Sequence, residues 1–110
     1  MVLDVIMDKE SITIPVENPF HADIDGITKR IEGFISSKGM DSGGHDFRGL
    51  IPKMIKGIAG CENGCPSDAK RLVSRGVKGF ELEYIEGGIL SARTYLKNGG
   101  TLYLKLFPDF

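Results

Sequence analysis

Along residues 11–16, Ile12, Ile14 and Val16 alternate with Ser11, Thr13 and Pro15, which is the pattern of a β-strand with one buried face. Residues 2–7 (VLDVIM) and 11–16 (SITIPV) are rich in β-branched residues and meet at the polar segment 8–10, so they predict a hairpin. Pro15 has no amide hydrogen to donate to a neighbouring strand. We therefore expect the second strand to lie at a sheet edge or to end there.

The hydrophobic period lengthens to three and four residues after Asp23. The apolar residues that follow recur at the spacing of one helix face and are Ile24, Ile27, Ile31, Phe34 and Ile35. Asp23 can accept hydrogen bonds from the free amides at the helix start, and Gly39 can take the left-handed conformation after its end. The sequence thus predicts a capped amphipathic helix, followed by the glycine-rich loop 39–47.

A second helix is predicted by another apolar stripe, which comprises Leu50, Ile51, Met54, Ile55 and Ile58. Proline is tolerated in the first turn of a helix, so Pro52 places the expected start near Arg48 or Gly49. A third helix is expected from Pro66, which suits the first helical position, to Gly76, which stops it.

In the last third of the chain, the hydrophobic period falls to two residues. Residues 80–85, 89–96 and 101–107 predict three strands, separated by turns at 86–88 and 97–100. The whole chain, 1–110, is therefore expected to be one α+β domain, because a run of strands, a run of helices and a second run of strands produce two layers. The expected order is ββαααβββ, with an antiparallel sheet of about five strands and three helices on one face.

In the last strands, aromatic residues and leucines occupy alternate positions, so they point to opposite faces of the sheet. If the helices cover the leucine face, Tyr95, Tyr103 and Phe107 form the opposite face of the sheet, together with Arg93 and Lys105. An exposed aromatic surface of this kind suits a protein partner or self-association.

Composition narrows the class of protein. The chain has 110 residues, of which 41% are hydrophobic and 26% charged, as in ordinary globular domains. A net charge of −1 argues against a nucleic-acid binder that works by phosphate neutralisation. The opening residues do not read as a signal peptide and no stretch is long and apolar enough to span a membrane, so a cytoplasmic protein without membrane contact is expected.

Both cysteines lie in one short segment, GCENGC at 60–65. If Cys65 is the N-cap of the third helix, its sulfur faces free amides and the positive end of the helix dipole, which stabilise a thiolate. The turn dipeptide between the cysteines places them on either side of a tight bend, so a reversible disulfide is geometrically feasible. Cys65 is then the expected nucleophile and Cys61 its resolving partner.

The same pair can also serve as metal ligands. Two thiolates three residues apart fit one half of a zinc site, and His45 in the glycine-rich loop can add a nitrogen ligand. The candidate metal ligands are therefore Cys61, Cys65 and His45. A site that a second subunit or partner completes is an open alternative.

The GCENGC segment resembles the Gly-Cys-x-Asn-Gly-Cys segment of the siroheme-containing sulfite and nitrite reductases. In those enzymes two such cysteines hold part of an iron–sulfur cluster next to the siroheme, so the resemblance implies Cys61 and Cys65 as the corresponding ligand pair. An ordinary cubane cluster needs four thiolates and this chain has two cysteines, so such a centre would be shared with another chain.

Two hypotheses from different classes follow. In the first, a small accessory protein uses Cys61 and Cys65 as a redox dithiol or as part of a metal site. In the second, the protein is a non-catalytic interaction module, which can be a homodimer through its sheet face, and the cysteines only fix a turn. The first is the more specific hypothesis, and the sequence leaves open whether the protein is an enzyme.

Overall fold

The computed structural model of the chain describes residues 1–18, 21–40, 45–59, 79–85, 88–97 and 99–108. Within these ranges, five strands form one antiparallel sheet, and two helices pack against it. The elements are β1 (Val2–Met7), β2 (Glu10–Pro15), α1 (Ile24–Ser37), α2 (Phe47–Ala59), β3 (Glu81–Ile85), β4 (Ile89–Tyr95) and β5 (Thr101–Phe107). The expected α+β class and antiparallel five-stranded sheet are confirmed.

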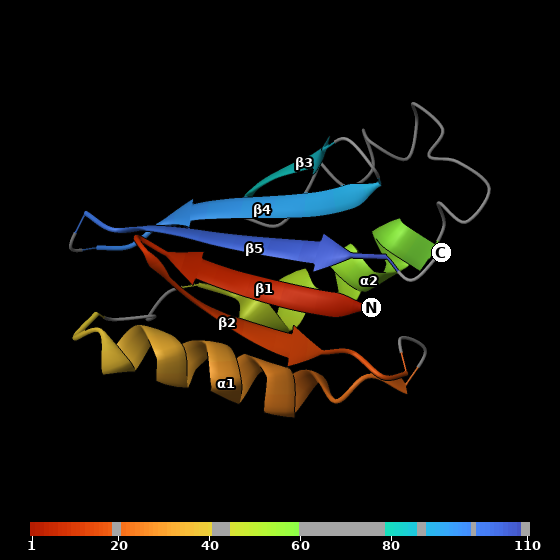
Figure 1. The fold of residues 1–110 in the computed structure, drawn as a ribbon, viewed down its shortest axis with the longest axis horizontal. Helices are drawn as coiled ribbons and strands as arrows, with labels where there is room; N and C mark the ends of the chain where they lie inside the picture. Colours follow the sequence, from red (N-terminus) through yellow and green to blue (C-terminus); the bar gives the residue numbers. More distant parts are fainter. Residues whose placement is uncertain (19–20, 41–44, 60–78, 86–87, 98, 109–110) are drawn as a thin grey trace.

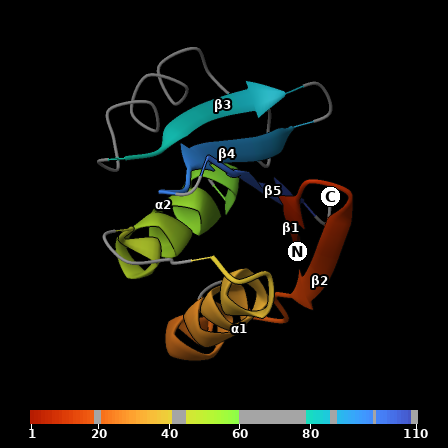
Figure 2. The same cartoon turned by 90° about the vertical axis from the view of Figure 1, so that its left-hand side faces the viewer.

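Both described helices lie on one side of the sheet, which curves around them (Figure 1, Figure 2). The third helix, expected from Pro66 to Gly76, lies outside the described residues and stays a prediction. In the described part of the chain, neither helix is long and apolar enough to cross a membrane.

The strand order across the sheet is β2-β1-β5-β4-β3, so β5 occupies the centre. β1 pairs with β5 along its whole length, with Val5 opposite Leu104. This pairing joins the hairpin of β1 and β2 to the meander of β3, β4 and β5. β2 lies at one edge of the sheet, as its Pro15 predicts.

The face of the sheet that meets the helices is apolar, because alternate side chains of each strand point to it. Its buried hydrophobic residues are Leu3, Val5, Met7, Ile14, Leu90, Ala92, Leu102, Leu104 and Leu106. The helices supply the facing layer with Ile27, Ile31, Phe34, Ile35, Leu50, Ile51, Met54, Ile55 and Ile58. Burying one large side chain of this kind stabilises the fold by roughly 1.5–3 kcal/mol, so the contact between these two layers is its main source of stability.

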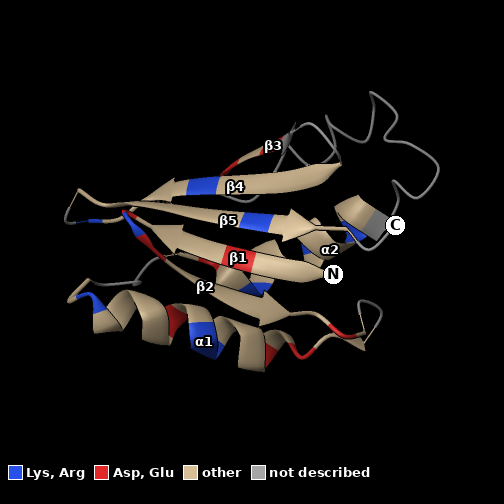
Figure 3. Cartoon of the chain, in the orientation of Figure 1, with Lys and Arg blue, Asp and Glu red and all other residues tan. Residues whose placement is uncertain are grey.

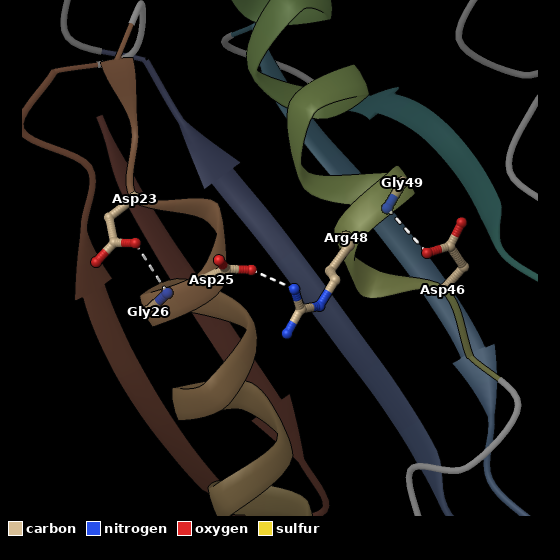
Figure 4. A network of polar contacts seen from close by, with 6 residues as sticks. All are labelled: Asp23, Asp25, Gly26, Asp46, Arg48 and Gly49. Carbon is tan, nitrogen blue, oxygen red and sulfur yellow. Dashed lines mark hydrogen bonds and ion pairs between the residues drawn. The ribbon is translucent and has the colours of Figure 1, made fainter.

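Both helices begin with the same four-residue cap, Asp-x-x-Gly. Asp23 Oδ1 accepts a 3.0 Å hydrogen bond from the amide of Gly26, and Asp46 Oδ1 accepts a 3.0 Å bond from the amide of Gly49 (Figure 4). A Cβ atom at either glycine would overlap the carboxylate of its cap. Glycine at the third helical position therefore makes room for the capping side chain.

The first turns of the two helices are also joined to each other. Arg48 of α2 forms an ion pair with Asp25 of α1, and Figure 4 shows this pair between the two caps. Arg48 lies at the positive end of its own helix dipole, which is unfavourable for a cation, and the carboxylate of Asp25 offsets that effect. Both side chains are more than half exposed, so the pair contributes only about 0–1 kcal/mol.

Helix α2 begins at Phe47, one residue before the expected start near Arg48 or Gly49. Pro52 therefore lies inside the helix rather than in its first turn, where the sequence predicts it. An interior proline removes one helical hydrogen bond and costs about 3 kcal/mol. The cap from Asp46 and the burial of Phe47, which is 2% exposed, favour the earlier start despite this cost.

The α1 cap predicts a specific energetic coupling. Asp23→Ala should lower the free energy of unfolding by about 1 kcal/mol, because the Gly26 amide loses its acceptor. Gly26→Ala alone should change little, because its gain in helix propensity of about 1 kcal/mol is offset by displacement of the cap. In the Asp23→Ala background, the same substitution should stabilise by about 1 kcal/mol. Urea unfolding of the four proteins measures the coupling, and additive effects would contradict it.

Candidate functional site

The outer face of the sheet, which is the face turned away from α1 and α2, carries a mixture of aromatic, aliphatic and charged side chains. Its central members come from β1, β5 and β4 and are Val2, Asp4, Ile6, Tyr103, Lys105, Phe107, Ser91, Arg93 and Tyr95. Most of them are half-buried by their neighbours, and Tyr95 is 60% exposed. The expectation that the aromatics and two cations lie opposite the leucine face is confirmed.

The strand register arranges these side chains in rows. One polar row crosses the whole sheet and runs Thr13, Asp4, Lys105, Ser91 and Glu83 from β2 to β3. Within it, Thr13 Oγ1 donates a 3.0 Å hydrogen bond to Asp4, and Lys105 lies directly opposite Asp4 on β5. Figure 3 shows the acidic segment of β1 beside the basic segment of β5.

Apolar positions flank the Asp4–Lys105 pair on both sides. Val2 lies opposite Phe107 toward one end of the sheet, and Ile6 lies opposite Tyr103 toward the other end. All four side chains are partly exposed. The centre of the outer face is therefore a pair of opposite charges between two apolar pairs.

Arg93 lies at the centre of a second cluster of polar side chains, nearer to β3. Its guanidinium forms an ion pair with Glu81, the residue opposite it on β3, and lies 5.8 Å from the ring centroid of Tyr95. The hydrogen bond to Glu81 and the negative charge of this residue raise the pKa of Arg93 above its ordinary value. Arg93 therefore keeps its charge and is held in place by partners on either side.

Described residues line one hollow on the outer face and another away from it. One of about 230 Å³ lies on the outer face, lined by Glu81, Leu82, Glu83, Ser91, Arg93 and Tyr103. Another of about 280 Å³ lies where the chain passes from β2 to α1. Both are below the roughly 300–1,000 Å³ typical of small-molecule pockets. Neither of these two hollows reaches the usual size of a small-molecule pocket.

Of the three residues expected to carry redox or metal chemistry, the structure describes only His45. Cys61 and Cys65 lie outside the described residues, so the dithiol and metal hypotheses stay predictions. Among the described residues, no group of three or more His, Cys, Asp or Glu side chains is placed to hold a metal ion.

His45, the third expected metal ligand, packs against aromatic rings. Its ring centroid lies 6.0 Å from that of Phe47 and 5.8 Å from that of Phe80. Its Nε2 lies 3.2 Å from the carbonyl oxygen of Tyr95, and because a carbonyl only accepts, Nε2 must be the donor. In the neutral ring Nδ1 is then an acceptor, and it is buried without a hydrogen-bond partner among the described residues.

This environment gives His45 a packing role. The residue joins the start of α2 to Phe80, just before β3, and to Tyr95 at the end of β4. Its second ring nitrogen, Nδ1, is withdrawn from solvent.

Replacement of His45 tests this packing role. His45→Ala should lower the free energy of unfolding by about 1–2 kcal/mol, because it removes a hydrogen bond and two ring contacts. The matched control is His21→Ala, at an exposed histidine, which should change stability by less than about 0.5 kcal/mol. Urea unfolding compares the two variants, and equal small effects would show that His45 does not hold α2 to the sheet.

Sequence reasoning missed the Arg93–Glu81 pair and the Asp46 cap. Arg93 and Glu81 occupy outward positions on neighbouring predicted strands, but the register between those strands was not fixed by their alternation. Asp46 begins one of three Asp-x-x-Gly segments, at 23–26, 41–44 and 46–49, and the first of these begins with the predicted cap Asp23. Of the two later segments, only 46–49 is followed directly by the apolar stripe from Leu50, and this is the signal that would have located the start of α2.

Comparisons of the chain with protein-family models, with curated proteins and with solved structures found no match. The function is therefore argued from the residues of the chain itself.

Proposed function

We propose that the protein is a non-catalytic interaction module that binds a protein partner through the outer face of its sheet. One observation carries this proposal: in the described part of the chain, both helices lie on the leucine face and neither lies on the face that bears Tyr95, Tyr103 and Phe107 (Figure 2). Contact with a partner would withdraw these rings from water, which is favourable in proportion to the apolar area removed.

The residue types on this face support the proposal. Tyrosine, phenylalanine and arginine are enriched at the centres of protein interfaces, and tyrosine and arginine supply a large share of their binding energy. The side chain of Arg93 is already held by Glu81 and stacked near Tyr95, so its immobilisation on binding costs little additional entropy.

Site-specific cross-linking in the native cell tests the proposal. A photoreactive phenylalanine analogue is placed at position 95 on the outer face, and the matched control carries it at position 29 on the exposed side of α1. We expect covalent adducts with protein from position 95 and far fewer from position 29. The adduct mass reports the partner class, since a doubled chain mass indicates a second copy. Absence of adducts at position 95, or equal yields at both positions, would overturn the proposal.

The sequence supports a second proposal, in which a small cytoplasmic accessory protein uses Cys61 and Cys65 as a redox dithiol or as part of a zinc or iron–sulfur site shared with another chain. The supporting observation is the Cys65-Pro66 pair at the start of the expected third helix. Free amides at such a position stabilise a thiolate. The third candidate ligand, His45, packs against Phe47 and Phe80.

Thiol reactivity tests this second proposal. Alkylation followed against pH should give a Cys65 pKa below the ~8.5 of a free thiol, and Cys61→Ser should keep that reactive thiol whereas Cys65→Ser should lose it. Anaerobic purification without chelators, followed by metal analysis, tests the metal site in the same variants. Titration at the free-thiol value, together with no bound metal and unchanged stability in the doubly substituted protein, would overturn this second proposal.

A further inference from the structure

We propose that the partner of the outer face is a second copy of this chain, packed face to face about a two-fold axis that runs parallel to the strands between β1 and β5. This inference rests on the proposed function and adds to it the identity of the partner and the register of the contact. Its basis is the charge pattern at the centre of the face, where Asp4 and Lys105 lie opposite each other on neighbouring strands.

A two-fold axis between two strands exchanges the residues on either side of it. Asp4 of one copy then faces Lys105 of the other copy, and Lys105 of the first faces Asp4 of the second. Neighbouring strands are about 4.8 Å apart and packed sheets about 10 Å apart, a gap that the long lysine side chain can bridge to a carboxylate. The four charges form a ring of alternating sign, in which each charge has an opposite charge beside it and another across the interface.

The same operation matches the flanking positions by chemistry. Val2, which lies opposite Phe107 within one sheet, faces Phe107 of the other copy. Ile6 faces Tyr103 in the same way. Apolar side chains thus meet apolar side chains on both sides of the charge ring, and the two sheets keep nearly aligned strands, which is the usual arrangement of packed sheets.

Other placements of the axis match less well. An axis that runs along β5 itself would set Lys105 against Lys105, and an axis along β1 would set Asp4 against Asp4. Like charges placed directly opposite each other at an interface cost several kcal/mol. Of these three axes parallel to the strands, the one between β1 and β5 is the one that sets opposite charges against each other.

The size of the contact sets its expected strength. The outer face of the sheet is convex (Figure 2). Two copies that pack through this face therefore make close contact only at the strands nearest the axis. The four strands nearest the axis, each of about six residues, cover at most roughly 19 by 20 Å, or about 380 Å² per copy, which is below the roughly 800 Å² per partner of a standard specific interface. We therefore expect a dimer that dissociates on dilution in the micromolar range.

Charge reversal in purified protein tests the inference. Sedimentation equilibrium of the native chain, Asp4→Lys, Lys105→Asp and the double variant is compared over a roughly hundredfold range of concentration in the micromolar regime. Each single reversal should weaken dimerisation about a hundredfold, since two like-charge contacts replace two attractive contacts. The double variant should recover the dimer. Far-UV circular dichroism verifies that every variant is folded.

Mixing the two single variants distinguishes the effect of charge contacts between copies from the effect of charge contacts within one sheet. In a mixed dimer, the carboxylate introduced by Lys105→Asp in one chain would face the ammonium group introduced by Asp4→Lys in the other. The mixture should therefore dimerise although neither variant does so alone. The neighbouring charges within each sheet remain alike on mixing. The matched control is Glu83→Lys, which changes the same polar row outside the overlap and should leave dimerisation within about twofold of the native value.

A native chain that stays monomeric throughout this range would overturn the inference. Single reversals without effect, or a mixture that does not dimerise, would also overturn the proposed register. Adducts from position 95 to a protein of different mass, with a monomeric purified chain, would remove the dimer and leave the interaction module intact. Absence of both dimer and adducts would remove the two together.

Discussion

The pairing of β1 with β5 is the contact on which the rest of the structure depends. It brings together strands from opposite ends of the chain through three opposed apolar pairs, Leu3 with Leu106, Val5 with Leu104 and Met7 with Leu102. All six side chains are at most 2% exposed. Without this pairing the N-terminal hairpin and the C-terminal meander would be separate sheets, and α1 and α2 would have no continuous surface to cover. Because its partners are so far apart in sequence, this contact is also expected to form late in folding.

The same pairing assembles the outer face. Alternation along β1 and β5 sends leucine, valine and methionine toward the helices and leaves Asp4, Lys105 and their apolar neighbours on the other side. The helices are fixed to the inner side by their buried isoleucines, and an ion pair between Lys38 and Glu10 ties the end of α1 to the start of β2. In the described part of the chain, the pairing of β1 with β5 thus both completes the sheet and forms the proposed partner-binding surface.

Local features of the fold could be predicted from the sequence, because each is encoded within a few residues. The cap at Asp23, the left-handed Gly39 with φ of 72° and the bounds of β5 at 101–107 all follow from nearby patterns. The pairing of β5 with β1 could not be predicted in this way, because alternation fixes which side of a strand is buried and not which distant strand lies beside it. Pro52 placed the expected start of α2 slightly too late for a similar reason. The cap at Asp46 and the burial of Phe47 favour a start at Phe47, although this leaves Pro52 inside the helix.

The features of the candidate site also differ in whether nearby residues of the sequence are enough to predict them. Parity alone identified the aromatic and basic residues of the outer face, whereas the Asp4–Lys105 and Arg93–Glu81 neighbours required the register. The role expected for His45 as a ligand rested on its place in a glycine-rich loop. Its contacts with Phe47, Phe80 and Tyr95 could not be foreseen, because these residues are distant in the chain or belong to another element. The hypotheses on Cys61 and Cys65 stay predictions.

A dilution series followed by methyl NMR examines the outer face without any substitution. If this face is the binding surface and the partner is a second copy, the methyl resonances of Val2 and Ile6 should move progressively as the protein is diluted. The methyl resonances of Ile31 and Leu50, buried between the layers, should stay in place. Resonances of Val2 and Ile6 that do not change with concentration, or changes centred on the helices instead, would contradict self-association through the outer face.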